Sequence, residues 1–80
     1  MTVTIRLFAS YADKLGRSAF EIECAEGSTV ADIVRSVTSL PGGSSLPPMP
    51  LVAVNRIYAD SGTPVSDGDE VAIIPPVAGG

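Results

Sequence analysis

Residues 67–80 read Asp67-Gly68-Asp69-Glu70-Val71-Ala72-Ile73-Ile74-Pro75-Pro76-Val77-Ala78-Gly79-Gly80. The Asp-Gly-Asp sequence is typical of a tight turn, and the apolar run after it predicts a strand from Glu70 to Ile74. In that strand Val71 and Ile73 lie on one face, and Ala72 and Ile74 lie on the other. Pro75-Pro76 ends the strand, because proline offers no N–H to a neighbouring strand. The four residues after it are left as a tail.

Upstream of this stretch, alternating apolar and polar residues predict more strands. These strands are expected over Thr2–Phe8, Ser18–Cys24, Leu51–Asn55 and Ile57–Tyr58. In the first of them Val3, Ile5 and Leu7 face the core, and Phe8 is out of phase with that set. A short helical turn from Ser10 to Leu15, ended by Gly16, connects the first two strands.

One longer amphipathic helix follows the second strand. Thr29 is a good N-cap and Asp32 lies near the positive end of the helix dipole. Val30, Ile33, Val34 and Val37 recur at helical spacing. Pro41-Gly42-Gly43 is expected to stop the helix. Residues 42–50 are rich in Gly, Ser and Pro, which predicts a surface loop.

The order strand, strand, helix, strand, short strand, strand predicts an α+β fold. One amphipathic helix can cover only one face of a small sheet, so the other face stays open. At 80 residues the chain has room for about one domain. This order and length suggest a β-grasp arrangement with a mixed sheet of about five strands, one main helix and a flexible C-terminal Gly-Gly tail. Chain order alone does not distinguish this arrangement from other small α+β folds.

Composition excludes several classes of protein. The formal charge of −4 argues against a nucleic-acid binder and fits a soluble protein that meets basic partners. The chain has no His and a single Cys, so His-based catalysis, an internal disulfide and a Cys- or His-rich metal site are excluded. Cys24 shares a strand face with Phe20 and Ile22, which favours a core position. With no signal peptide or membrane span visible, a cytoplasmic location is expected.

The Gly79-Gly80 ending is the feature most informative about chemistry. An extended Gly-Gly segment can enter a channel too narrow for other residues. The Gly80 carboxylate, activated as an acyl-adenylate, could accept sulfur or an amine. A tail from Pro75 to Gly80 spans about 20 Å at roughly 3.3 Å per residue, enough to reach into a partner's active site. The alternative for a bare Gly-Gly end is a frayed terminus. Here the Gly-Gly pair closely follows Pro75-Pro76 at the end of the last strand, which favours a functional tail.

The chain resembles the family of molybdopterin synthase small subunits. The resemblance covers nearly the whole chain, and the ending Pro75-Pro76-Val77-Ala78-Gly79-Gly80 is its most specific part. Support comes from Leu7-Phe8-Ala9, Gly27-Ser28-Thr29-Val30 and Val52-Ala53-Val54-Asn55. Two departures are visible: Ile73-Ile74 stands where the family commonly has aromatic residues, and residues 42–50 match no family pattern.

This resemblance implies a ubiquitin-like β-grasp domain over residues 1–76 and a tail over residues 77–80 that carries the thiocarboxylate. It implies a sulfur carrier whose Gly80 is adenylated and becomes a thiocarboxylate. A large synthase subunit then uses the sulfur to build the dithiolene of molybdopterin from cyclic pyranopterin monophosphate. The chain itself is expected to bind no cofactor and no metal, and to be non-catalytic alone. ATP is used by a separate activating enzyme, and a sulfur donor completes the set of partners, with no nucleic acid or membrane among them.

Strand alternation and the family resemblance together predict a docking face for a partner protein. Phe8 and Ile74 are out of phase with the core residues of the first and last strands, which should be neighbours at the centre of the sheet. We expect Phe8, Tyr58 and Ile74 to form one exposed apolar patch, with Arg6 at its rim. Pro75, Pro76, Val77, Ala78 and Gly79 are expected to thread into the partner behind Gly80.

Three alternatives stay open. The chain could carry sulfur for another pathway, such as thiamine synthesis or tRNA thiolation. It could be a ubiquitin-like modifier that forms an isopeptide bond through Gly80. It could also be a passive interaction module in which the Gly-Gly pair is incidental.

Overall fold

The computed structural model describes residues 1–46 and 50–75. Its elements in chain order are β1 (Thr2–Leu7), α1 (Ala9–Leu15), β2 (Ala19–Glu23), α2 (Val30–Thr38), the short 3₁₀ helix η1 (Gly43–Ser45), β3 (Leu51–Val54), β4 (Ile57–Tyr58) and β5 (Glu70–Ile74). All of the predicted strands are present: β4 and β5 have the predicted bounds, and β1, β2 and β3 are shorter by one residue at one or both ends. The expected tail residues Pro76, Val77, Ala78, Gly79 and Gly80 lie outside the described residues, as do residues 47–49 of the predicted surface loop.

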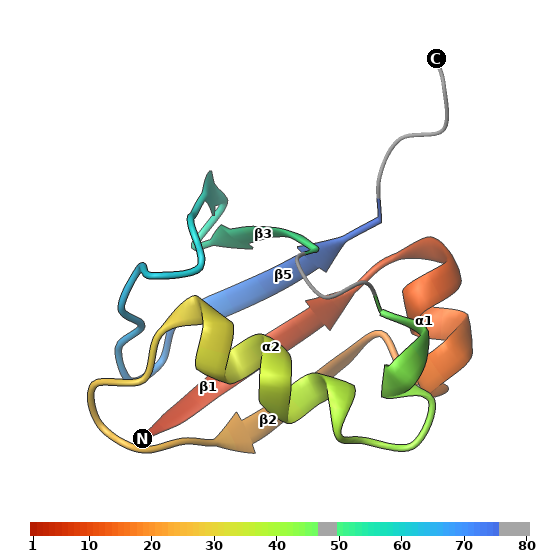
Figure 1. The fold of residues 1–80 in the computed structure, drawn as a ribbon, viewed down its shortest axis with the longest axis horizontal. Coiled ribbons are helices and arrows are strands. Elements are labelled where there is room, and N and C mark those ends of the chain that lie inside the picture. Colours follow the sequence, from red (N-terminus) through yellow and green to blue (C-terminus); the bar gives the residue numbers. More distant parts are fainter. Residues whose placement is uncertain (47–49, 76–80) are drawn as a thin grey trace.

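The strands form one mixed sheet in the order β2-β1-β5-β3-β4. β1 and β5 run parallel at its centre, with Ile5 opposite Val71 and Leu7 opposite Ile73. Every other neighbouring pair in this sheet is antiparallel. Figure 1 shows α2 lying across one face of the sheet and α1 at the end where β1 finishes. The predicted α+β class, the central β1–β5 pair and the β-grasp arrangement are therefore confirmed.

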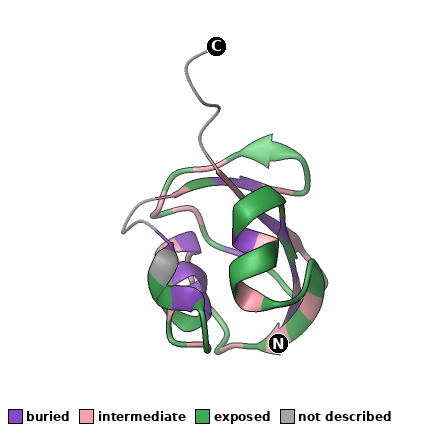
Figure 2. Cartoon of the chain, turned by 90° about the vertical axis from the view of Figure 1, so that its right-hand side faces the viewer, coloured by how far each residue is buried: buried purple, intermediate pink, exposed green. Residues whose placement is uncertain are grey.

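The hydrophobic core lies between α2 and the sheet. Ile5 and Ile73, from the two central strands, are completely buried, as is Ile33 from the helix. The other members, all at most 7% exposed, are Val3, Leu7, Tyr11, Val30, Val34, Val37, Leu46, Val52, Val65 and Val71. In Figure 2 the buried segments, in purple, line the interior surfaces of sheet and helices. The periodicity of the sequence correctly placed the core faces of β1, β5 and α2.

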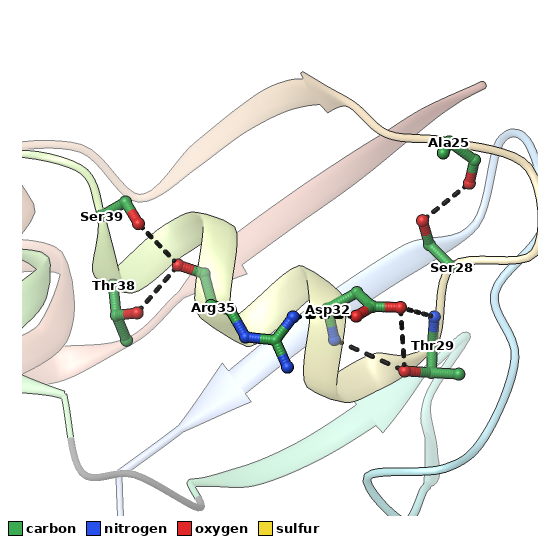
Figure 3. A network of polar contacts seen from close by, with 7 residues as sticks. All are labelled: Ala25, Ser28, Thr29, Asp32, Arg35, Thr38 and Ser39. Carbon is green, nitrogen blue, oxygen red and sulfur yellow. Dashed lines mark hydrogen bonds and ion pairs between the residues drawn. The ribbon is translucent and has the colours of Figure 1, made fainter.

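Helix α2 begins with a complete capping box. The Asp32 carboxylate accepts hydrogen bonds from the Thr29 backbone N–H at 2.9 Å and from the Thr29 hydroxyl at 3.2 Å, and the Asp32 N–H donates to Thr29 Oγ1 at 3.4 Å. Arg35 adds an ion pair to Asp32 at 3.0 Å (Figure 3). The Thr29 N–H and the Arg35 guanidinium hold the pKa of Asp32 below its ordinary value. This network confirms the predicted helix start.

The helix ends earlier than predicted. It stops at Thr38 with Ser39 as its cap, before the expected stop at Pro41-Gly42-Gly43. The hydroxyls of Thr38 and Ser39 both donate to the Arg35 carbonyl oxygen, at 2.9 and 3.0 Å (Figure 3). These hydroxyls satisfy a carbonyl oxygen of the last helical turn, so the helix can end here without a glycine.

The prediction that residues 42–50 are a surface loop is wrong for its first half. Gly43 is buried and Leu46 is 6% exposed as a member of the core. A side chain at Gly42 would collide with the backbone carbonyl of Lys14 in α1, and one at Gly43 would collide with that of Val37 in α2. The glycines therefore let η1 wedge between the two helices and carry Leu46 into the core.

The turn from β3 to β4 has an unusual backbone. Asn55 and Arg56 have φ angles of 50° and 72°, as a two-residue type I′ turn requires. The Asn55 side chain donates to Asp69 Oδ1 and accepts from the Glu70 N–H, both at 3.0 Å. The left-handed conformation costs a residue with a side chain roughly 1–2 kcal/mol. Asn55 offsets this cost with two hydrogen bonds that fix the turn against β5.

Candidate protein-docking site

The sheet face opposite α2 carries the residues that point away from the core. Register places four of them in one row across four strands. Arg6 on β1 is opposite Ala72 on β5, Ala72 is opposite Ala53 on β3, and Ala53 is opposite Tyr58 on β4. Two alanines therefore lie between the large side chains of Arg6 and Tyr58, and the row continues onto β2 at Ala19, which is opposite Arg6.

The alanines make the row concave. Ala53 and Ala72 are 5% and 8% exposed, so their methyl groups form a floor below the larger neighbours. A hollow of about 270 Å³ lies above them, and its lining residues are Arg6, Phe8, Ala53, Arg56, Tyr58, Glu70, Ala72 and Ile74. We call this surface the docking hollow. It is shallow and open, with an apolar floor and charged groups at its margin, which suits a protruding side chain of another protein better than a buried substrate.

The walls of the docking hollow are exposed apolar side chains. Phe8 is 40% exposed and Tyr58 is 71% exposed, whereas Ile74 is half-buried. Phe8 and Ile74 lie at the ends of β1 and β5 that point the same way, because these strands run parallel. Pro75 follows Ile74 directly, so the chain leaves β5 at the border of the hollow.

Charged groups are fixed at one side of the hollow. Arg6 Nη1 lies 3.6 Å from Glu70 Oε2, and the Arg6 guanidinium carbon lies 5.8 Å from the centroid of the Phe8 ring. Both side chains of the ion pair are partly exposed, so the pair contributes little to folding stability. Its effect is to hold the Arg6 guanidinium over the ring of Phe8.

The structure brings together all four docking residues expected from the sequence, namely Arg6, Phe8, Tyr58 and Ile74. Sequence analysis missed Ala53, Ala72, Glu70 and Arg56. The alanines gave no signal because small residues on an open face look unremarkable until the register puts them side by side. Pro75 is half-buried at the border, and the remaining tail residues of the predicted site lie outside the described ranges.

The described residues offer little else for chemistry. In residues 1–46 and 50–75 no cluster of His, Cys, Asp or Glu is arranged to hold a metal ion. Cys24 is half-buried and packs against the core, as predicted. None of the helices in these ranges combines the length and apolar character that a transmembrane helix needs.

Comparisons with known proteins point to one group. The sequence model of the ThiS family matches residues 5–80. A molybdopterin synthase sulfur carrier subunit from Dictyostelium discoideum is 35% identical over 80 residues, covering 95% of this chain and 93% of that protein.

Two solved structures extend the comparison. SAMP1, small archaeal modifier protein 1, from Haloferax volcanii has a TM-score of 0.85 and 25% identity, with 100% of both chains covered. A complex of subunits 1 and 2 of molybdopterin-converting factor from Helicobacter pylori contains a chain with a TM-score of 0.75 and 25% identity, again with 100% of both chains covered.

Proposed function

Because the chain belongs to the ThiS family, we propose that it is a sulfur carrier of the molybdopterin synthase small-subunit type. The observation that carries this proposal is the 35% identity to the Dictyostelium discoideum sulfur carrier subunit across nearly the full length of both proteins. The fold agrees, since a chain in the complex of subunits 1 and 2 of a molybdopterin-converting factor has a similar structure, with a TM-score of 0.75.

In this proposal residues 1–76 form the folded domain and residues 77–80 form the tail that carries the sulfur. The Gly80 carboxylate is first adenylated by an activating enzyme that consumes ATP. A sulfur donor then displaces AMP, which leaves a thiocarboxylate on Gly80. In the synthase complex two such carriers each pass one sulfur to cyclic pyranopterin monophosphate, because a dithiolene contains two sulfur atoms, and water returns each Gly80 to its carboxylate. The chain supplies the carrier, and the catalytic groups belong to its partners.

The docking hollow is proposed to bind the large subunit of molybdopterin synthase. It adjoins the point where the chain leaves β5 at Ile74 and Pro75. A protein seated on Phe8, Tyr58 and Ile74 would therefore have the tail at its border. Pro75, Pro76, Val77, Ala78 and Gly79 would lead Gly80 into the active site of that protein.

Mass spectrometry tests the sulfur-carrier proposal. The protein is incubated with ATP, its activating enzyme and a sulfur donor, and fragment masses locate any oxygen-to-sulfur exchange. We expect the exchange on Gly80, no product after deletion of Gly80, and normal product from a Cys24→Ser control. Sulfur found on Cys24, or a competent protein without Gly80, would contradict the proposal.

A second candidate function is protein modification, favoured by the similarity to small archaeal modifier protein 1. Both functions share the acyl-adenylate of Gly80. They differ in the acceptor, which is sulfur for the carrier and the amine of a target lysine for the modifier. Recovery of many lysine-linked conjugates from cells, with no association with a synthase large subunit, would favour the modifier.

A further inference from the structure

The docking hollow has the opposite charge to the rest of the molecule. Two of the five basic residues, Arg6 and Arg56, line it, but only one of the nine acidic residues, Glu70, does. The hollow therefore carries a formal charge of +1, whereas the remainder of the chain carries −5. An acidic protein with a locally positive contact surface is suited to a partner that is negative at that contact.

The two arginines of the hollow differ in their partners. Arg6 is already neutralised by Glu70 at 3.6 Å and lies over Phe8. Arg56 is exposed, and within residues 1–46 and 50–75 its guanidinium takes part in neither ion pair of the structure. The unbalanced positive charge of the hollow is therefore that of Arg56.

The backbone at Arg56 gives an independent indication. Its φ of 72° is at the second central position of the turn, where type I′ hairpins strongly prefer glycine after asparagine. The two side-chain hydrogen bonds of Asn55 offset the cost of its positive φ. The Arg56 side chain takes part in no hydrogen bond or ion pair found in the described ranges. A strained residue whose side chain contributes nothing to the fold is a candidate for a function outside it.

We propose that the docking partner places an apolar side chain in the hollow and a carboxylate, from aspartate or glutamate, against Arg56. This inference rests on the proposed function, because it describes the partner of the same surface. Ala53 and Ala72 leave room for the apolar group, and Phe8, Tyr58 and Ile74 surround it. The planar guanidinium suits a carboxylate through paired hydrogen bonds.

The test measures the affinity for the large synthase subunit from the same organism, by titration calorimetry at about 0.05 M and about 0.5 M salt. The variants are Arg56→Gly, which removes both the charge and the strain, and Arg56→Gln, which removes the charge alone. Arg17→Gln is the matched control. It removes the same charge at a residue that lies against Phe20 and outside the hollow.

We expect both Arg56 variants to bind roughly tenfold more weakly at low salt and to lose much of the salt dependence. Arg17→Gln should bind like the wild type. Arg56→Gly should melt at the same temperature as the wild type or higher, since glycine adopts the positive φ freely. Unchanged affinity and salt dependence for Arg56→Gly would overturn the inference.

Phe8→Asp in the same assay separates this inference from the proposed function. If Phe8→Asp prevents binding and Arg56→Gly does not weaken it, the docking hollow stands and the carboxylate contact is wrong. If the wild type does not bind the large subunit, both the docking proposal and the inference are overturned.

Discussion

At the scale of single residues, Leu46 shows how a core position can escape sequence analysis. It is 6% exposed, yet its neighbours are Gly, Ser and Pro, whose composition indicates a loop. We expect Leu46→Ala to lower the free energy of unfolding by about 2–4 kcal/mol, from lost burial and the cavity left behind. Leu51→Ala is the matched control, because Leu51 is 46% exposed and its loss should cost much less. Urea denaturation measures both, and equal losses would contradict the assignment.

The floor of the docking hollow gives a second prediction at this scale. Ala72→Leu should fill the hollow and weaken binding to the large subunit roughly tenfold or more, while the added side chain extends into open space above the sheet. Ala19→Leu adds the same bulk to the same face, at the β2 position opposite Arg6 and outside the hollow. It should bind normally. If the two variants bind alike, the hollow is not the contact.

The same residues show where sequence reasoning reaches its limit. Phe8 and Ile74 could be placed on the open face because strand alternation fixes the direction of each side chain. Ala53 and Ala72 could not be recognised, since their importance depends on cross-strand register. Arg56 could not be recognised either, because its positive φ becomes known only with the backbone.

At the scale of elements, the capping box of α2 links helix stability to pH. Thr29→Ala removes the acceptor for the Asp32 N–H and the hydroxyl donor to its carboxylate. Such a change typically costs about 1 kcal/mol. Chemical denaturation at neutral pH measures the loss, and an unchanged free energy of unfolding would contradict the role of the cap.

Asp32→Asn tests the pH dependence of the same element. Because the folded-state pKa of Asp32 is lowered, the charged form stabilises the fold at every pH above the ordinary value of 3.8. That contribution is lost as pH falls through the lowered pKa. The stability gap between wild type and Asp32→Asn should therefore be full at pH above that value and shrink in more acidic solution. A gap that stays constant throughout acid titration would contradict this linkage.

Elements with a regular period were predictable, and their ends were less so. The strands and α2 followed from period and N-cap chemistry alone. The end of α2 was misplaced because the hydroxyls of Thr38 and Ser39 are local hydrogen-bond donors that compete with the glycine signal further along. η1 depends on contacts with both helices, which no local pattern contains.

At the scale of the whole molecule, we expect the side chains on the open face of the sheet to contribute to docking and not to folding stability. Phe8 is the N-cap residue of α1 and makes no side-chain hydrogen bond there, whereas aspartate is among the best N-cap residues. Phe8→Asp should therefore keep or raise the melting temperature. It should nevertheless weaken binding to the large subunit by about 2 kcal/mol or more, roughly thirtyfold, because it removes an aromatic side chain and buries a charge.

Circular dichroism and calorimetry on the same samples measure both effects. Loss of structure in Phe8→Asp would mean that the side chain supports the core. Unchanged affinity would mean that the partner docks elsewhere.

The position of β5 has a consequence for how the protein is made. β5 is the only strand in the sheet that joins the β2-β1 pair to the β3-β4 pair, and it comes after all of them along the chain. A nascent chain therefore cannot close its sheet until the ribosome has released this strand. Ala72 and Ile74 reach the hollow in that same step. A partner that binds the proposed docking hollow would therefore not recognise a chain that ends before β5, because Glu70, Ala72 and Ile74 would be missing from the surface.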